Sequence, residues 1–287
     1  MNALLILGMA ALAATSAPFT EGEIETVVEN RKFTEGPLYL PDGTLLFSDI
    51  PADQIYNDKD EVFREPSGQS NGLTLDGRGR LLAAEHKGRR VSITEADGTV
   101  KSLADSYDGK RLHSPNDVIV RSDGRVFFTD PPYGGNEPEM DVFGMYAVSP
   151  EGAVTRLVDD AVKPNGLALS PDEKTLYLAD TDLSNIRAFD LAADGTVSNG
   201  RQLCEAPRPD GIKVDTEGNI WATCKDGVRV ISPAGDLLET IEFPQQPSNC
   251  AFGGKDGKTL YVTARTGVYK VRVKVEGIRP QPAQAAE

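Results

Sequence analysis

Histidine and cysteine are scarce in this chain of 287 residues, which contains two of the former and three of the latter. The cysteines are Cys204, Cys224 and Cys250, and the histidines are His86 and His113. Their spacing matches no pattern of zinc ligands, so we do not expect a structural zinc site. An odd number of cysteines leaves at least one thiol free, even in an exported protein.

Basic residues are also in the minority, with 30 Lys and Arg against 44 Asp and Glu and a formal net charge of -14. This balance argues against a nucleic acid partner, because phosphates require a basic protein surface. The sequence contains neither a nucleotide-binding phosphate loop nor the G-x-G-x-x-G fingerprint of dinucleotide-binding proteins. The acidity is typical either of a soluble protein or of one that holds cations.

Long apolar runs are absent except near the N-terminus. Residues 3–14 are almost wholly apolar but too few to span a bilayer comfortably, and small residues follow up to Ala17. The pattern predicts a signal peptide over residues 1–17, a secreted or periplasmic location, and no membrane span after cleavage. No Lys or Arg precedes Arg31, which keeps a buried N-terminal helix open as the alternative.

One sequence unit recurs six times along the chain. It consists of a polar residue, a small residue, an apolar run, a turn with Asp or Gly, and a second apolar run. Neighbouring units begin 36 to 49 residues apart. The polar residues that open them are Glu35, Asn71, Asn116, Asn165, Asp210 and Asn249.

Each unit is typical of a β-hairpin followed by two further short strands. A period near 40 residues with four strands per unit predicts an all-β fold, a six-bladed β-propeller over residues 24–275. Two β-sandwich domains would not explain a repeat that runs along the whole chain. We expect residues 23–29, EIETVVE, to close the last blade by pairing outside residues 266–275. The tail at 276–287 is polar and rich in proline, and we expect it to be frayed.

The innermost strand of each blade lines the central channel of a propeller. The six polar residues that open these strands would then meet around the axis, and we call them the oxygen ring. Two are carboxylates and four are amides, a set of oxygens that suits a hard divalent cation. Calcium fits best, and magnesium is more demanding of geometry. The alternative is that Asn-Gly and Asp-Gly are ordinary turn residues, although this does not account for Glu35.

The second strand of each hairpin returns to the same end of the channel. The residues that end these strands are Asp49, Glu85, Asp130, Asp180, Cys224 and Arg265. Four of the six are acidic, and we expect them to orient the backbone and the side chains of the oxygen ring.

At these positions the chain resembles the senescence marker protein, gluconolactonase and luciferin-regenerating-enzyme family. The resemblance extends over roughly Phe33–Val273. The segments that carry it are FTEGPLYLPDGTLLFSDI, GKRLHSPNDVIVRSDGRVFFTDPPYG, KPNGLALSPDEKTLYLADT, RPDGIKVDTEGNIWA and AFGGKDGKTLYVTA.

The resemblance implies a six-bladed propeller with one divalent cation, usually calcium, at the channel mouth. By motif position it implies Glu35, Asn165 and Asp210 as metal ligands and Asn116 beside them, as a ligand or a substrate contact. It also implies hydrolysis of sugar lactones, with some relatives acting on other esters or on phosphorus compounds.

The chemistry expected of such a site is polarisation of the lactone carbonyl by the metal, with Asp210 or a water that it holds as general base. His86 and Tyr133 are candidate substrate contacts, and the alternatives are a structural hydrogen bond for His86 and loop packing for Tyr133. Some animal relatives carry an arginine two residues before the position of Asn116. Ser114 stands there instead, which leaves the exact substrate open.

The sequence therefore predicts an exported, calcium-dependent sugar lactonase with a small-molecule lactone as its partner. Two other hypotheses stay open: a non-catalytic propeller that binds a sugar or protein ligand, and a metal-dependent esterase of another substrate class. The sequence does not determine the oligomeric state.

Cleavage of the signal peptide can be checked on protein purified from its native host. N-terminal sequencing or intact mass should show a chain that begins after Ala17, because small residues there form a cleavage site. Retention of residues 1–17 on the mature protein would contradict the expectation.

Overall fold

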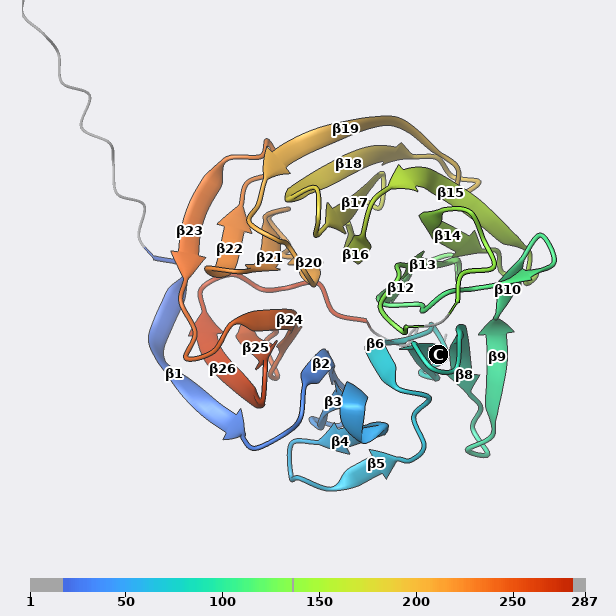
Figure 1. Ribbon diagram of the computed structural model, residues 1–287. Helices are drawn as coiled ribbons and strands as arrows, with labels where there is room; N and C mark the ends of the chain where they lie inside the picture. Colours follow the sequence, from blue (N-terminus) through green and yellow to red (C-terminus); the bar gives the residue numbers. More distant parts are fainter. Residues whose placement is uncertain (1–17, 136, 281–287) are drawn as a thin grey trace, which may run out of the picture.

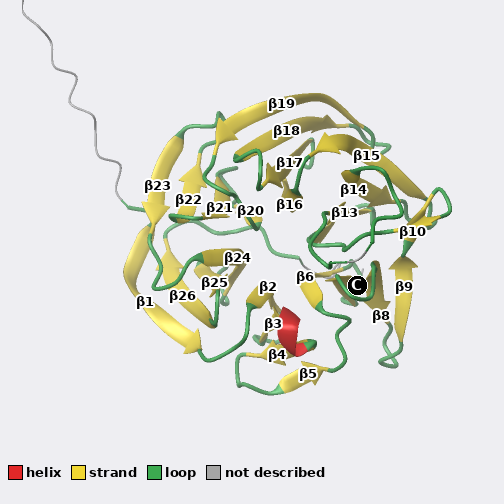
Figure 2. Cartoon of the chain, in the orientation of Figure 1, coloured by secondary structure: helices red, strands yellow, loops and turns green. Residues whose placement is uncertain are grey.

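The computed structural model describes residues 18–135 and 137–280, and six four-stranded antiparallel sheets surround a central axis as blades (Figure 1). This arrangement confirms the predicted six-bladed β-propeller. The one helix in the described part of the chain is the short 3-10 helix η1 (Ile50–Ala52), red in Figure 2. The signal peptide expected over residues 1–17 lies outside the described residues.

Each blade is built from four strands in sequence order from the axis outward, except for the last blade. The innermost strands are β2 (Thr34–Tyr39), β6 (Ser70–Leu75), β12 (Val118–Val120), β16 (Pro164–Leu169), β20 (Ile212–Val214) and β24 (Pro247–Gly253). The second strands are β3 (Leu45–Asp49), β7 (Leu81–Glu85), β13 (Val126–Asp130), β17 (Thr175–Asp180), β21 (Ile220–Cys224) and β25 (Thr259–Ala264).

The third strands are β4 (Gln54–Asn57), β8 (Arg90–Thr94), β14 (Phe143–Val148), β18 (Asn185–Leu191), β22 (Gly227–Ile231) and β26 (Gly267–Val273). The outermost strands are β5 (Val62–Arg64), β9 (Val100–Ala104), β15 (Val154–Ala161), β19 (Val197–Glu205), β23 (Leu237–Ile241) and β1 (Thr20–Val28). A small hairpin lies in the connection from β9 to β12 and consists of β10 (Ser106–Tyr107) and β11 (Lys110–Arg111).

The hydrophobic core lies between neighbouring blades, because the blades pack face to face. Every residue of β3, β7, β13 and β21 is buried, whereas most of β19 at the outer edge is exposed. Trp221 shows how two blades meet: its ring is 5.3 Å from that of Phe252 in the next blade. Its Nε1 donates to Asp215 Oδ2 at 2.9 Å, so this polar group is satisfied although the side chain is fully buried.

The ring of blades is closed by the first strand of the described chain. β1 pairs antiparallel with β26 and completes the sheet that contains β24 and β25, as predicted for residues 23–29. The side chain of Val28 in β1 packs with Leu45, Phe47 and Val268, which belong to the first and last blades. The N-terminal strand therefore joins the two ends of the propeller through both hydrogen bonds and apolar contacts.

The expectation of a frayed C-terminal tail is wrong for the residues that directly follow β26. Gly277 forms a β-bridge with Asp215, and Ile278 N donates to Val214 O at 3.0 Å. Arg279 Nη1 donates to Gly254 O at 2.8 Å. These contacts hold residues 276–280 across the ends of the inner strands β20 and β24, because the unpaired groups there accept and donate backbone hydrogen bonds.

None of the three cysteines forms a disulfide. Cys224 and Cys250 are buried and Cys204 is half-buried. Among residues 18–135 and 137–280, no helix is long and apolar enough for a membrane crossing.

Because β1 closes the ring of blades, we expect the stability of the protein to depend on the packing of Val28 in this strand. Val28→Ala should lower the free energy of unfolding by about 1–3 kcal/mol, because it removes buried methyl groups from the contact between the first and last blades. Glu25→Gln in the same strand should change it by less than about 1 kcal/mol, because the Glu25–Lys270 ion pair is exposed. Urea denaturation of both variants measures the difference, and equal losses would contradict the role of Val28.

Candidate metal centre and active site

The oxygen ring forms as predicted at one end of the channel. Four of its members lie in the innermost strands: Glu35 in β2, Asn71 in β6, Asn165 in β16 and Asn249 in β24. The other two, Asn116 and Asp210, lie two residues before β12 and β20. All are buried except Asp210, which is partly exposed.

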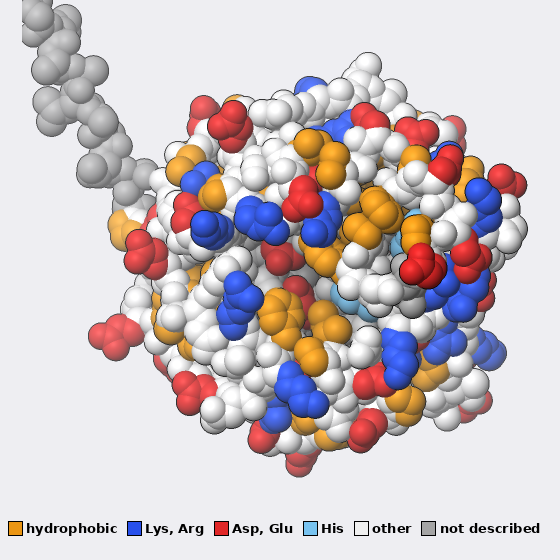
Figure 3. Space-filling view, viewed as in Figure 1, with side chains coloured by type: hydrophobic (Ala, Val, Ile, Leu, Met, Phe, Trp, Pro, Cys, Tyr) orange, Lys and Arg blue, Asp and Glu red, His pale blue; other side chains and the backbone are white. Residues whose placement is uncertain are grey.

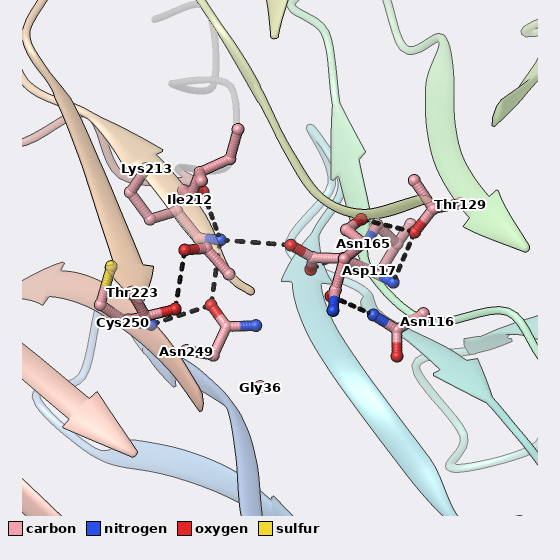
Figure 4. Close-up of polar contacts among 12 residues, drawn as sticks. Gly36, Asn116, Asp117, Thr129, Asn165, Ile212, Lys213, Thr223, Asn249 and Cys250 are labelled. Carbon is pink, nitrogen blue, oxygen red and sulfur yellow. Dashed lines mark hydrogen bonds and ion pairs between the residues drawn. The ribbon is translucent and has the colours of Figure 1, made fainter. Parts of the chain in front are cut away.

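Hydrogen bonds join three of the amides in an arc. Asn71 Nδ2 donates to Asn116 Oδ1 at 2.5 Å, and Asn116 Nδ2 donates to Asn165 Oδ1 at 2.6 Å. The second of these bonds is drawn in Figure 4. The arc leads toward Asp210, whose carboxylate is stabilised by the Asn165 amide. Glu35 in turn interacts with Asp210 and Asn249, so the six polar residues of the oxygen ring meet around the axis.

Glycine after a ring residue lets neighbouring blades approach each other. A Cβ on Gly36 would lie 1.9 Å from the carbonyl oxygen of Asn71, and one on Gly166 would lie 2.3 Å from that of Asp210. Both distances are far inside van der Waals contact, so a side chain at either position would push the inner strands apart. Glu35-Gly36 and Asn165-Gly166 lie within strands, which excludes the turn explanation for these two pairs.

Three of the acidic residues that end second strands hold the backbone before the ring. Each carboxylate accepts two backbone N–H groups, from the residues three and two positions before the ring residue of its blade. The pairs are Lys32 at 3.0 Å and Phe33 at 3.1 Å on Asp49, His113 at 2.9 Å and Ser114 at 2.8 Å on Asp130, and Val162 at 2.7 Å and Lys163 at 3.1 Å on Asp180. The predicted positioning role is confirmed for these three.

The other blades do not use this clamp. Glu85 is buried and forms ion pairs with Arg64 and with Arg90, whose Nε lies 2.7 Å from Glu85 Oε2. In the last two blades the equivalent residues are Cys224 and Arg265. Neither side chain contains a carboxylate.

Two carboxylates share the centre of the ring. The pKa of Glu35 is raised well above its usual value, first by burial and then by the negative charge of Asp210. Burial also raises the pKa of Asp210 to about 7, and the charge of Asp117 adds to this effect. The Asn165 hydrogen bond and the charges of Arg208 and Arg265 lower it. A cation between the carboxylates would remove the electrostatic cost of burying both as anions.

The residues present fit a hard divalent cation. The donors are carboxylate and amide oxygens, and Asn71 Oδ1 is buried without a hydrogen-bond partner in the described part of the chain. No group of three His, Cys, Asp or Glu side chains able to hold a metal occurs among the described residues, so the amides would have to supply the remaining ligands of a cation. Asn249 is the least suited, because its Oδ1 already accepts a hydrogen bond from Cys250 N at 2.8 Å.

His86 and Tyr133 both lie against the amide arc. His86 Nε2 is 3.0 Å from Asn116 Oδ1, and burial lowers the pKa of His86 to about 4, so the imidazole is neutral at pH 7. The His86 ring stacks on Tyr133 at 6.0 Å. Asn165 Nδ2 donates to Tyr133 Oη at 3.0 Å. His113 lies elsewhere, edge-on to Phe143 at 4.8 Å.

A cavity of about 390 Å³ opens at this end of the channel. Figure 3 shows the hollow from outside, with acidic side chains inside it and basic side chains around it. Its lining consists of Phe33, Tyr133, Thr181, Arg208, Asp210, Lys225, Gln246, Pro247, Ser248 and Arg265. Of the predicted site residues, Asp210 and Tyr133 line the cavity directly.

An ion pair that the sequence analysis missed lies deeper in the channel. Lys213 Nζ is 3.6 Å from Asp117 Oδ2 and 3.5 Å from Asn249 Oδ1, and Figure 4 shows it between these two residues. Burial raises the pKa of Asp117, and the charge of Lys213 opposes that rise. The only signal in the sequence is the dipeptide Asn116-Asp117, where other units have Gly or Cys after the polar residue.

A serine with the spacing of a nucleophile elbow occurs at Gly68–Gly72, GQSNG. The structure gives it another role. Ser70 begins strand β6, is fully buried, and its Oγ lies 2.9 Å from Ser48 Oγ. An elbow needs a strand, a sharp turn and a helix, and no helix follows here. Ser70 therefore does not serve as a nucleophile of that type.

Comparison with known proteins identifies the family of this chain. The family described as "SMP-30/Gluconolactonase/LRE-like region" matches residues 33–266. The chain belongs to this family. Its resemblance to the family, inferred above from sequence motifs, is thus confirmed.

Two curated members illustrate the range of the SMP-30/gluconolactonase family. A gluconolactonase of Zymomonas mobilis is 33% identical over 293 residues, covering 88% of this chain and 82% of that protein. Regucalcin of Oryctolagus cuniculus is 30% identical over 271 residues, covering 86% of this chain and 88% of that protein.

Solved structures show the same propeller. A gluconolactonase of Xanthomonas campestris has a TM-score of 0.82 at 33% identity, over 87% of this chain and 89% of that one. A calcium-binding regucalcin of Agrobacterium tumefaciens has a TM-score of 0.77 at 21% identity, over 91% of this chain and 97% of that one, which shows a shared fold.

The oxygen ring predicts a selective loss of cation binding. Calcium should raise the melting temperature of the wild-type protein, because a ligand that binds only the folded state stabilises it. Glu35→Gln should abolish the rise, since it removes one of two anionic ligands. Asn249→Ala should keep most of it, since its oxygen is already used by Cys250 N. Differential scanning fluorimetry after treatment with a chelator measures all three, and an equal loss in both variants would contradict this choice of ligands.

Proposed function

We propose that the protein is a divalent-cation-dependent hydrolase that opens sugar lactones. The observation that carries the proposal is the pair of carboxylates, Glu35 and Asp210, within a ring of amide oxygens at the base of a cavity. Support comes from membership of the SMP-30/gluconolactonase family and from two gluconolactonases that are 33% identical over most of their length.

Calcium is the cation we propose. Glu35, Asn165 and Asp210 would hold it, with Asn116 beside them as a further ligand or a substrate contact. The all-oxygen donor set supports this choice, as do relatives named regucalcin, one of which is described as a calcium-binding protein. When bound, such a cation supplies Lewis acidity that polarises a carbonyl oxygen.

The side chains of this chain supply the proton transfer and the orientation. Asp210 is the ring member that faces the cavity, so it can take a proton from the attacking water. Water adds to the carbonyl carbon, the bond from that carbon to the ring oxygen breaks, and the proton taken from the water passes to the released ring oxygen, which becomes a hydroxyl group. The product is a hydroxy acid. Tyr133 and neutral His86 can orient hydroxyl groups of the substrate from one side.

Ser114 does not replace the arginine found at its position in some animal relatives. Its Oγ accepts hydrogen bonds from Tyr133 N and Gly134 N, both at 2.9 Å, and also binds Pro131 O. The hydroxyl is thus occupied in holding the loop of Tyr133. Any polar contact to the substrate on this side must come from other residues. The substrate of this chain therefore cannot be inferred from those relatives that have the arginine.

We also propose that the protein is exported to the periplasm or beyond the cell. The support is the apolar run near the N-terminus and the small residues up to Ala17.

The proposed function can be tested by acid release from glucono-1,5-lactone. Wild-type protein should lose turnover with EDTA and recover it with added calcium. Glu35→Gln and Asp210→Asn should each lower kcat/KM by roughly 100-fold or more, because each removes a charge at the reacting centre. Glu151→Gln, at an exposed turn between β14 and β15, is the matched control and should retain wild-type turnover.

Full activity in either ring variant would overturn the site. Absence of turnover with the cation bound would point instead to another lactone or ester, or to a propeller that binds its ligand without catalysis.

A further inference from the structure

Three cationic side chains line the cavity above the oxygen ring. They are Arg208, Lys225 and Arg265, and we call them the basic rim. They come from three places in the last two blades: the segment before β20, the residue after β21 and the residue after β25. Figure 3 shows Lys and Arg side chains around the hollow, although the whole protein has a net charge of -14. The overall composition of the chain, in which acidic residues outnumber basic ones, therefore does not explain the local excess of positive charge.

Two of the three cations of the basic rim form no ion pair with a carboxylate among the described residues, although the charges of Arg208 and Arg265 also stabilise the Asp210 carboxylate. Lys225 is exposed and forms no ion pair with any of the residues that the structure describes. Arg265 donates from Nη2 to the neutral Gln246 Oε1 at 2.8 Å. Only Arg208 has an acidic partner, Asp182, whose Oδ1 lies 3.4 Å from Arg208 Nη1.

Asp182 cannot balance the group by itself. Its other oxygen lies 3.6 Å from Lys163 Nζ, so one exposed carboxylate serves two cations. Exposed ion pairs of this kind contribute little and exchange readily with other anions. The basic rim is thus available to an anionic group of a ligand.

The metal centre does not account for the basic rim. Positive charges at the opening would repel a divalent cation, which the carboxylates of the oxygen ring would hold without them. A neutral lactone likewise gains little from three cations. Thr181 and Tyr133 add hydroxyl groups to the lining, and Lys163 Nζ lies 4.9 Å from the centre of the Tyr133 ring, so a further cation lies close to the cavity.

We propose that the substrate is a lactone that carries an anionic group, a carboxylate or a phosphate, which the basic rim binds while the carbonyl faces Glu35 and Asp210. Arginine and lysine form charge-assisted hydrogen bonds with both kinds of anion. The inference rests on the lactonase function proposed above and names the substrate class within it.

The experiment compares three lactones on the calcium-loaded wild-type protein. Glucono-1,5-lactone is neutral, glucaro-1,4-lactone carries a carboxylate, and 6-phosphoglucono-1,5-lactone carries a phosphate. At least one anionic lactone should show a kcat/KM about tenfold or more above that of the neutral lactone at low salt. Which of the two is preferred distinguishes carboxylate from phosphate. The preference should shrink in 0.5 M NaCl, because the Debye length at that ionic strength is only roughly a few ångströms.

Variants then assign the preference to the basic rim. Lys225→Gln and Arg265→Gln should each lower the ratio of anionic to neutral kcat/KM by roughly three- to tenfold. Lys225→Arg should restore most of it, because the charge is kept. Lys174→Gln is the matched control: its side chain is 79% exposed at a distant turn, and the ratio should not change.

The two failures are distinguishable. Hydrolysis of all three lactones with equal kcat/KM, unaffected by the variants, would overturn the inference and leave the lactonase intact. If no lactone is hydrolysed, the proposed function fails, and titration with gluconate, glucarate and 6-phosphogluconate decides the anion site. Binding of glucarate and 6-phosphogluconate that is lost in the Lys225→Gln/Arg265→Gln double variant would support it, and no binding would overturn it.

Discussion

The repulsion between Glu35 and Asp210 is the constraint around which the site is organised. On the axis of the propeller Glu35 is buried and Asp210 is partly exposed, and the negative charge of Asp210 makes Glu35 harder to ionise. Such an arrangement persists in a folded protein only where surrounding groups over-determine it. Here the hydrophobic blades supply the rigidity, and the amide arc supplies oxygen donors that add no further negative charge.

The fold places this pair by a few local devices repeated around the ring. Glycine after the ring residue removes the side chain that would hold neighbouring inner strands apart, and a carboxylate at the end of the next strand fixes the incoming backbone. Blades that lack the carboxylate, such as the fifth with Cys224, still deliver their ring residue, because the antiparallel pairing of inner and second strands sets the register. Sheet geometry thus places four of the six ring residues, and Asn116 and Asp210, just before their strands, are held by backbone hydrogen bonds to Thr129 O and Thr223 O in the second strands.

The repeated part of the molecule was predictable from the sequence, and the rest was not. Six blades, closure by β1, the oxygen ring and the clamps of Asp49, Asp130 and Asp180 follow from residues that recur at one place in the repeat. The Asp117–Lys213 pair occurs once, between two blades, so no periodicity reveals it. Arg208, Lys225 and Arg265 come together because three connections converge in space. The ordered residues 276–280 were mistaken for a frayed tail, because their partners lie in β20 and β24, which are distant in the sequence.

The ion pair of Asp117 and Lys213 lies in the channel of the propeller, next to the oxygen ring. It spans the gap between β12 and β20, beneath the ring, and Lys213 also lines a separate cavity of about 940 Å³ toward the opposite end of the channel. Residues 276–280 lie across strand ends at that far side. Lys213 thus contacts the oxygen ring through Asn249 and also lines the larger cavity, so a buried pair of opposite charges lies between the two ends of the channel.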